Sequence, residues 1–459
     1  MAEYVFQCDA RKSKRVMTTI FAPATLIGGS GLTVFRVSGE HAFESLKRVT
    51  SCTEIIPNKA LLKKIKHPKT GVVIDEGLIL PFKAPHSFTG EDVVEYHLHG
   101  GHAVADAFVD LMGFFDGYRM AEPGEFTKRA FENNKIDLTQ AEAIGDLIHA
   151  QTEAQRLLAM DQLSGGLKDL YQGWAQRLKK SLAFIEADID FSDEELPDEL
   201  SSSMKPILEE VIAQIYMHLN DARQGERLRE GIKIAVIGAP NAGKSSLLNK
   251  LAQRDIAIVT DIEGTTRDVL EVPLNLAGYP VILADTAGLR ETNDVVESEG
   301  IRRARKWAED ADIKIVLFDS SKTLDQESLS FIDDKTLICS TKADIHPSHE
   351  VIQGEVPIQL SVEDEAMLAN FIDIISGHVK DLMKHNNIEH KQAALITRQR
   401  HRKQVEEAQE CLARALIAPQ LDMMAEDVRL AVRALGKITG HVDVEDLLDV
   451  IFSEFCIGK

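Results

Sequence analysis

Cysteine is scarce in this sequence, and the cysteines present are scattered. The 459 residues contain five of them: Cys8, Cys52, Cys339, Cys411 and Cys456. None forms a CxxC pair, which argues against a disulfide framework and a zinc ribbon and suits a reducing compartment. A G-x-G-x-x-G dinucleotide signature is missing as well, so any redox step is expected from a partner.

Long hydrophobic runs are also missing. No apolar stretch approaches the roughly 20 residues of a membrane helix, and the start, MAEYVFQCDARKSKR, lacks the apolar segment of a signal peptide. Hydrophobic residues make up 44% and charged residues 27% of the chain, as in globular proteins. We therefore expect a cytoplasmic protein of two or three domains that does not associate with membranes.

Positive charge is in deficit. Lys and Arg number 52 against 73 Asp and Glu, a net charge of −21, so avid non-specific binding of nucleic acid is not expected. If RNA is a substrate, a partner or a local basic segment must attract it. The candidate segments, each of which can equally be solvated surface, are RKSKR at 11–15, KKIKHPK at 63–69 and TRQRHRK at 397–403.

The periodicity of apolar residues predicts several domains. Short apolar runs alternate with Gly and Pro over 1–135, which indicates an α+β domain. Helical spacing over 136–229 and again over 386–459 indicates an all-α domain made of two sequence halves. Between them, over 230–385, continuous apolar strands alternate with helices, as in a parallel sheet buried on both faces. The expected helices cover 138–163, 167–188, 204–228, 393–416, 421–438 and 442–452.

A phosphate-binding loop opens the α/β region. GAPNAGKSS, from Gly238 to Ser246, follows the strand IKIAVIG and precedes the helix SLLNKL, which fits G-x-x-x-x-G-K-[ST] in its strand–loop–helix context. The loop N–H groups and the helix N-terminus favour phosphate oxygens. Lys244 should reach the β- and γ-phosphates, and Ser245 should ligate Mg²⁺.

Three later stretches complete a GTP site. In TDIEGTTRD, at 260–268, Thr266 would complete the Mg²⁺ shell, and in DTAG Asp285 would hold Mg²⁺ through water. In TKAD, at 341–344, Asp344 can accept from guanine N1–H and N2–H₂, which adenine lacks, so GTP should be preferred. Thr341 replaces the usual Asn, and LSVED at 360–364 is a weaker guanine element. The residues expected to contact GTP are Asn241, Ala242, Gly243, Lys244, Ser245, Ser246, Thr260, Asp261, Ile262, Glu263, Gly264, Thr265, Thr266, Asp285, Thr286, Ala287, Gly288, Thr341, Lys342, Ala343, Asp344, Ser361 and Val362.

Leu289 follows DTAG where Ras-type GTPases have the glutamine that orients the attacking water. An apolar side chain cannot do this, so another group must position water and another cation must neutralise charge. Asn241, beside the phosphates, could help to cage K⁺ where other GTPases place an arginine finger. An acid of the second switch, Asp294, Glu297 or Glu299, could then orient the water.

These motifs, together with stretches on both sides of them, resemble one family. APHSFTGEDVVEYHLHGGH (84–102), AEPGEFTKRAFENNKIDLTQAEAIGDLI (121–148), PNAGKSSLLN, TDIEGTTRDV, DTAGLRET and the terminal FCIGK are similar to the MnmE (TrmE) family of tRNA-modification GTPases over nearly the whole chain. The shortened loop LIGGSGLT at 26–33 departs from the family pattern.

The resemblance implies a fold and a function. The α/β region would be a Ras-like P-loop G domain inserted into the helical domain, behind a folate-binding and dimerisation domain. The protein would be a homodimer that works with the FAD protein MnmG, in a heterotetramer or larger complex. Together they would add a carboxymethylaminomethyl or aminomethyl group to C5 of the wobble uridine of certain tRNAs. The carbon donor would be a tetrahydrofolate derivative, 5-formyl- or 5,10-methylene-.

The resemblance also assigns residue roles. It implies that K⁺ is held by Asn241, Thr260, Ile262 and Thr265, that Mg²⁺ is held by Ser245 and Thr266, and that catalysis depends on Glu297, Lys244 and Asn241. It further implies that Arg36, Glu95, Lys135 and Lys459 bind the folate, with Cys456 as a candidate thiol.

Strand alternation agrees with a ligand-facing Glu95. In EDVVEYHLHG, Glu95, His97 and His99 share one face, and Val94, Tyr96 and Leu98 share the other. A carboxylate suits the N–H and amino edge of a pterin. The histidines, with His102, could suggest a metal site, but no cysteine or second acidic cluster accompanies them.

Two other functions stay open on the residues alone. A regulatory or ribosome-assembly GTPase would only hydrolyse GTP, but such proteins usually carry a basic RNA-binding module, and none is visible here. A folate enzyme with an attached GTPase regulator would act on a small molecule and would need no flavin-bearing partner.

Overall fold

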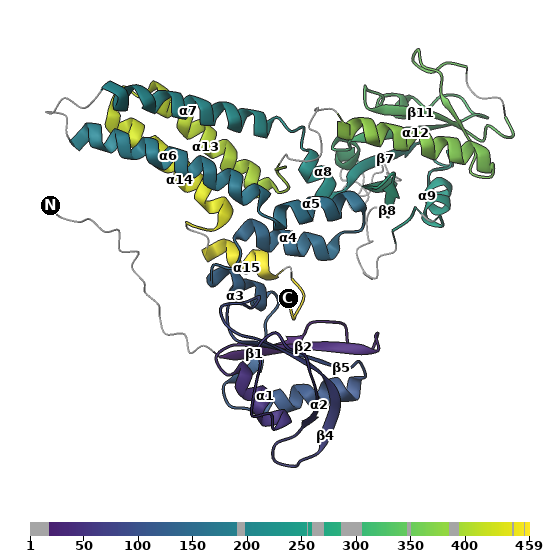
Figure 1. Ribbon diagram of the computed structural model, residues 1–459. Helices are drawn as coiled ribbons and strands as arrows, with labels where there is room; N and C mark the ends of the chain where they lie inside the picture. The colour runs from purple at the N-terminus through teal and green to yellow at the C-terminus, as the bar shows by residue number, and fades with distance from the viewer. Residues whose placement is uncertain are drawn as a thin grey trace, which may run out of the picture. The chain divides into compact units, whose positions relative to one another are not determined.

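The computed structural model describes residues 18–190, 198–254, 256–258, 270–285, 305–346, 350–384, 394–442, 445–453 and 455–459. The chain forms two compact units, Met1–Gly145 with Gly440–Lys459, and Asp146–Thr439 (Figure 1). None of the described helices combines the length and the apolar character that a membrane span requires.

The first unit is built on a six-stranded sheet in the order β3-β4-β5-β2-β1-β6. All neighbours are antiparallel except β1 and β6. Helices α1 and α2 cover one face, and their apolar side chains join Phe35, Tyr96 and Leu98 in one core. The elements are β1 Thr19–Pro23, β2 Leu32–Ser38, α1 Ala42–Thr50, β3 Leu61–Lys66, β4 Val73–Phe82, β5 Val93–His99, α2 His102–Gly113, β6 Tyr118–Met120 and α3 Glu125–Glu132. The predicted α+β domain is therefore confirmed.

The end of the chain packs within this first unit. Helix α15 (Glu445–Ser453) supplies Ile451 and Phe452 to an apolar cluster with Leu138 and Ala141. A Cβ on Gly124, just before α3, would lie only 2.4 Å from the Phe452 carbonyl oxygen, so the two segments are in close backbone contact. Glycine is required at that approach.

The helical part of the second unit has its own apolar core. Segments far apart in sequence form it: Trp174 comes from α6, Val211 from α7, Val405 from α13 and Val428 from α14. The amphipathic spacing of these helices explains this packing, because each buries one stripe of apolar side chains. Helix α4, Leu138–His149, begins in the first unit and ends in the second. The helices that follow it are α5 Glu153–Leu163, α6 Gly166–Asp190, α7 Asp198–Leu219, α8 Gln224–Glu230, α13 Gln399–Ile417 and α14 Leu421–Thr439.

Three expected helix boundaries are wrong. The helix expected over 138–163 is broken at Thr152, which caps α5 by exchanging hydrogen bonds with Gln155. The helix expected over 204–228 is broken before α8, where Ala222 and Arg223 have left-handed φ values of 49° and 57°. Helix α13 begins at Gln399 rather than near 393, because residues 394–398 are extended.

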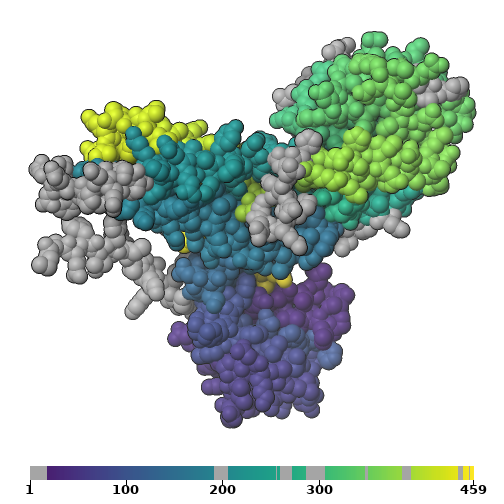
Figure 2. Space-filling view, turned by 45° about the horizontal axis from the view of Figure 1, so that its top comes forward, coloured from purple at the N-terminus to yellow at the C-terminus, as the bar shows by residue number. Residues whose placement is uncertain are grey.

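The remainder of the second unit is a doubly covered α/β domain with the strand order β12-β11-β10-β7-β9-β8. All pairs are parallel except β8 with β9. This is the arrangement of a Ras-like G domain, and its atoms, coloured teal to green, form a compact body in Figure 2. The elements are β7 Ile232–Gly238, α9 Lys244–Ala252, β8 Leu270–Leu276, β9 Tyr279–Asp285, β10 Ile313–Asp319, α11 Gln326–Leu329, β11 Thr336–Thr341, β12 Ile358–Leu360 and α12 Glu365–Lys384. The predicted strand IKIAVIG is confirmed as β7, and β10 is buried along its whole length, as expected for a sheet covered on both faces.

Candidate functional site: a guanine cavity beside a phosphate loop

The phosphate loop joins β7 to α9. Asn241 and Gly243 have φ values of 64° and 96°, a left-handed conformation that curls the loop around the start of the helix. The Lys244 ammonium lies inside this curl and donates to the carbonyl oxygens of Gly238, at 2.7 Å, and Ala239, at 3.2 Å. The lysine is thus held at the mouth of the loop where phosphate oxygens are expected.

Ser245 and Asp285, two residues expected at the Mg²⁺ site, lie together. The Ser245 hydroxyl donates to Oδ2 of Asp285 at 3.0 Å, which connects the start of α9 to the end of β9. Asp285 is only 6% exposed, and its other oxygen, Oδ1, is buried without a protein partner among the described residues. A buried carboxylate oxygen beside a serine hydroxyl suits a hard, hydrated cation.

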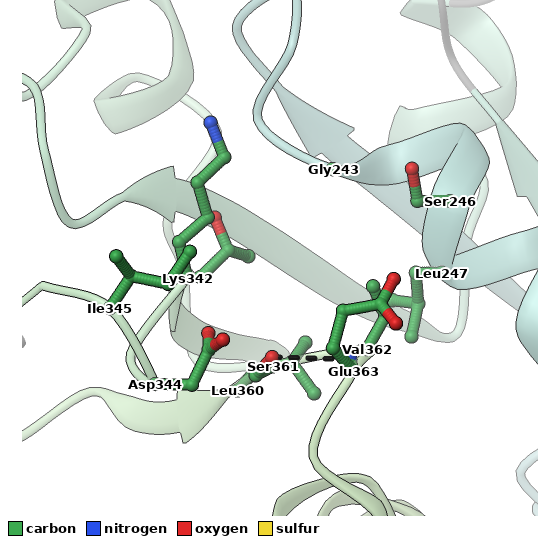
Figure 3. A pocket seen from close by; sticks show the side chains of 11 residues that line it. Gly243, Ser246, Leu247, Lys342, Asp344, Ile345, Leu360, Ser361, Val362 and Glu363 are labelled. Carbon is green, nitrogen blue, oxygen red and sulfur yellow. Dashed lines mark hydrogen bonds between the residues drawn. The ribbon is translucent and has the colours of Figure 1, made fainter.

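A cavity of about 240 Å³ opens next to the loop. Figure 3 shows Asp344 and Ser361 on one side of it and Gly243, Ser246 and Leu247 on the other. Its lining thus combines the phosphate loop with the TKAD and LSVED segments, as expected for a guanine site. The lining residues are Gly243, Ser246, Leu247, Thr341, Lys342, Asp344, Ile345, Leu360, Ser361, Val362 and Glu363.

Thr341 ties the TKAD segment to the phosphate loop. Its hydroxyl donates to the Ala242 carbonyl oxygen at 2.9 Å, with the Phe318 carbonyl oxygen farther away at 3.3 Å. The side chain is buried, so this hydrogen bond is protected from water. Thr341 therefore keeps a structural bond although it lacks the amide of the usual asparagine.

Asp319, at the end of β10, is a site residue that the sequence analysis missed. It receives the Lys342 ammonium at 2.6 Å and the Ser321 hydroxyl at 2.6 Å. Burial opposes its ionisation, but these hydrogen bonds and the Lys342 charge lower the pKa of Asp319 to about 2. The only sequence signal was an acid closing a buried strand.

Many of the other expected site residues lie outside the described residues. They include the switch segments with Leu289 and the three candidate acids, and their assignments stay predictions. The expected residues that lie there are Thr260, Asp261, Ile262, Glu263, Gly264, Thr265, Thr266, Thr286, Ala287, Gly288, Asp294, Glu297 and Glu299.

In the first unit, Arg36 and Glu95 are cross-strand neighbours on β2 and β5. Both the Nε and an Nη of Arg36 donate to the same Glu95 oxygen, Oε1, at 3.1 and 2.9 Å. The other oxygen, Oε2, lies 3.8 Å from Nε2 of His97. Glu95 thus faces away from the helix-covered core, as strand alternation predicted, and keeps one oxygen that the arginine does not contact.

The other expected folate residues lie on loops of the same unit. The Lys135 ammonium donates to the Pro85 carbonyl oxygen at 2.8 Å. At the chain end, a Cβ on Gly458 would lie 2.0 Å from the Pro23 carbonyl oxygen, which places the residue before Lys459 directly against the end of β1. The Cys456 side chain is exposed.

The histidines do not form a metal centre in the part of the chain that the structure describes. His99 pairs with Asp75 at 2.8 Å, on β4, and no group of three or more His, Cys, Asp or Glu side chains converges among the described residues. His102 lies against Gly28.

Two of the three basic segments can be examined. In 397–403, Arg398 pairs with Asp146, Arg402 pairs with Asp221 and Glu226, and Arg400 donates to a carbonyl oxygen of α14. This segment therefore holds helices together rather than facing a nucleic acid. The segment 63–69 begins on the edge strand β3, which ends at Lys66, and continues into the turn that follows it; segment 11–15 lies outside the described residues.

Comparison with known proteins identifies the family of this chain. Residues 138–456 match the MnmE helical domain, and residues 19–135 match the GTP-binding protein TrmE N-terminus. The chain is 46% identical to a tRNA modification GTPase MnmE from Parvibaculum lavamentivorans, over 96% of this chain and 100% of that protein. It is 47% identical to the MnmE of Paramagnetospirillum magneticum, over 96% of this chain and 99% of that protein. The chain therefore belongs to the MnmE family of tRNA modification GTPases.

Proposed function

We propose that this chain is a K⁺-dependent GTP hydrolase acting in tRNA modification. With an MnmG-type FAD protein it would add a carboxymethylaminomethyl or aminomethyl group to C5 of the wobble uridine of certain tRNAs. The observation that carries the proposal is the cavity lined by Gly243 and Asp344, because a guanine base bound there would lie directly beside a phosphate loop. Membership of the family supports the tRNA part of the proposal.

In the G domain, phosphate is bound by the loop N–H groups and by Lys244, which lies at the mouth of the loop. Ser245 and Thr266 would hold Mg²⁺, and Asp285 would receive one of its waters through Oδ1, which has no protein partner among the described residues. When bound, Mg²⁺ neutralises the charge that develops on the phosphates. Asp344 selects guanine because adenine would leave its carboxylate unpaired.

Asn241, with Thr260, Ile262 and Thr265, would hold K⁺, which supplies positive charge in the region that an arginine finger occupies elsewhere. The exposed position of Asn241 in the loop supports this role because its side-chain oxygen is accessible to a cation. Glu297 would orient the attacking water in place of the glutamine that Leu289 replaces. GTP would drive the approach of the two G domains in a homodimer.

The N-terminal domain would bind the one-carbon tetrahydrofolate donor. Arg36 holds Glu95 through one oxygen only, so Oε2 can accept an N–H from the pterin edge. Lys135 and Lys459 would meet the anionic parts of the folate, and the close contact of Gly458 with Pro23 brings the chain end to the same sheet. Cys456 is exposed and stays a candidate thiol.

Nucleoside analysis of tRNA tests the whole proposal. In cells that lack this protein, wobble uridines of the affected tRNAs should lose the C5 group, and the wild-type gene should restore it. A Lys244→Ala variant should not restore it, because phosphate binding is removed. If the modified nucleoside persists in the deleted strain, the tRNA function is refuted.

A further inference from the structure

Thr341 bears on which atoms of the guanine base this protein recognises. The inference rests on the proposed GTPase function and extends it. Guanine presents two acceptors on one edge, O6 and N7, next to its N1–H and N2–H₂ donors. Asp344 can satisfy the donors. The acceptors need hydrogen-bond donors from the cavity wall, so the donor groups of that wall decide how many atoms of the base are recognised.

The hydroxyl of Thr341 is already committed. A threonine hydroxyl has one proton, and a carbonyl oxygen can only accept, so the 2.9 Å contact with Ala242 uses that proton. The alternative neighbour, the Phe318 carbonyl oxygen at 3.3 Å, is also an acceptor. Whichever carbonyl it serves, the hydroxyl can donate to a ligand only by giving up this hydrogen bond.

The other polar side chains described on the cavity wall are also poorly placed to donate a hydrogen bond to N7. The Lys342 ammonium is held by Asp319 at 2.6 Å. Ser361 accepts the Glu363 N–H at 3.2 Å and lies beside Asp344 (Figure 3), the residue expected to bind N1–H, so we expect it to face O6 rather than N7. Ser246 lies across the cavity with an exposed side chain, so a bond to N7 would replace a bond to water with little gain.

We infer that this protein does not recognise N7 of guanine, because the only hydrogen-bond donor of the Thr341 side chain is used in the bond to Ala242 of the phosphate loop. The base is selected through N1–H, N2–H₂ and O6. An asparagine at this position has two amide N–H groups, so it could keep the Ala242 bond and still reach N7. Thr341 is therefore a specificity-determining residue whose replacement adds one recognised atom.

The test is titration of the purified full-length protein with GDP and with 7-deaza-GDP, which has a C–H in place of N7. We expect the two dissociation constants to agree within about twofold for the wild type. Thr341→Asn should bind GDP about threefold to tenfold more tightly than 7-deaza-GDP, the worth of one net hydrogen bond. A wild-type protein that binds 7-deaza-GDP at least about fivefold more weakly than GDP would overturn the inference.

Two variants separate the explanations. Thr341→Val removes the Ala242 bond at nearly the same shape, so both nucleotides should weaken by the same factor and their ratio should stay near one. If the wild type does discriminate and Ser246→Ala abolishes the discrimination, N7 is recognised by Ser246 and the inference is wrong.

A second nucleotide checks the role of Asp344. IDP, which lacks the 2-amino group, should bind more weakly than GDP to every variant, because Asp344 can no longer accept a hydrogen bond from that group. Failure of GDP itself to bind would instead refute the proposed GTPase function.

Discussion

The Lys342 ammonium lies 2.6 Å from Oδ2 of Asp319, a carboxylate whose side chain is only 4% exposed. The pair joins the TKAD segment after β11 to the end of β10, and it fixes the lysine stem on the wall of the guanine cavity. Since the partner of Lys342 comes from a neighbouring strand, the position of the nucleotide base depends on the register of β10 with β11.

Replacement of Asp319 by Asn should weaken GDP binding about tenfold, because the Lys342 stem loses its anchor. Ser321→Ala is the matched control: it removes a smaller contact to Asp319 and leaves the ion pair intact, so it should weaken binding less. Isothermal titration measures both. Equal affinities for D319N and the wild type would show that the pair does not position the base.

The same carboxylate gives a pH dependence. Its pKa is about 2 in the folded protein, below the ordinary value of 3.8, so ionised Asp319 stabilises the fold. This contribution is complete above the ordinary pKa and is lost as the pH falls towards 2. The wild type should therefore exceed D319N in free energy of unfolding by a constant amount between pH 7 and about 5, and the difference should shrink below about pH 4. Denaturant titrations at each pH measure it.

GTP hydrolysis should be faster in K⁺ than in Na⁺ by at least about tenfold, at matched ionic strength, because Na⁺ is too small for the cage that Asn241 helps to form. Asn241→Ala should remove the difference between the two salts. Phosphate release assays give both rates. Equal rates in the two salts for the wild type would exclude the ion from the mechanism.

Lys135→Ala should weaken binding of 5-formyltetrahydrofolate by about tenfold and leave GDP affinity unchanged, since Lys135 is in the first unit and the G domain is in the second. Lys64→Ala removes an exposed lysine of the edge strand β3 and serves as control. An unaltered folate titration for K135A would refute the assignment of Lys135.

Gly458→Ala should displace the end of the chain. The residue has φ of 95°, and its added Cβ would meet the Pro23 carbonyl oxygen at 2.0 Å, so the backbone must move. If Lys459 contacts folate, G458A should weaken folate binding as much as Lys459→Ala does. Gly71→Ala has a similar φ of 73° with open space around its Cβ, and should bind folate normally. Normal folate binding by G458A would show that the end of the chain does not contribute to the folate site.

Arg402→Ala should lower the free energy of unfolding by about 3 kcal/mol. The guanidinium is buried against Asp221 at 2.7 Å and Glu226 at 2.9 Å. Removing it takes the ion pair from the buried Asp221 and leaves Glu226 with the more distant Arg223, at 3.6 Å. Arg429→Ala breaks an exposed pair with Glu186 and should cost less than about 1 kcal/mol. Thermal unfolding of the two variants compares them, and equal shifts would contradict a special role for the buried group.

The sequence predicted the G domain well because its signals are local. A phosphate loop needs a strand, a fixed glycine spacing and a helix, and each is visible in a few consecutive residues around Lys244. The alternation that places Glu95 and Tyr96 on opposite faces of the strand is equally local, and it is confirmed by the full burial of Tyr96 next to a partly buried Glu95. Such features do not depend on distant parts of the chain.

What the sequence did not reveal depends on distant partners. The bond from Thr341 to Ala242 and the pairing of Asp319 with Lys342 join residues that are separate in sequence, so no local pattern signals them. The basic run around Arg402 was ambiguous for the same reason, because its acidic partners come from other helices. The break at Thr152 has a local cause, because Thr152 and Gln155 form a Thr-x-x-Gln capping box that is visible in the sequence.

The cluster that joins Leu138 with Phe452 has a consequence for biosynthesis. A ribosome makes the strands of the first unit early, yet α15 emerges only after the whole of the second unit has been translated. Until then Leu138 and Ala141 lack the apolar cover of Ile451 and Phe452, and exposed apolar surface of this kind makes an incomplete chain prone to aggregation. A nascent chain halted after the G domain could thus hydrolyse nucleotide while its amino-terminal domain still awaited its final helix.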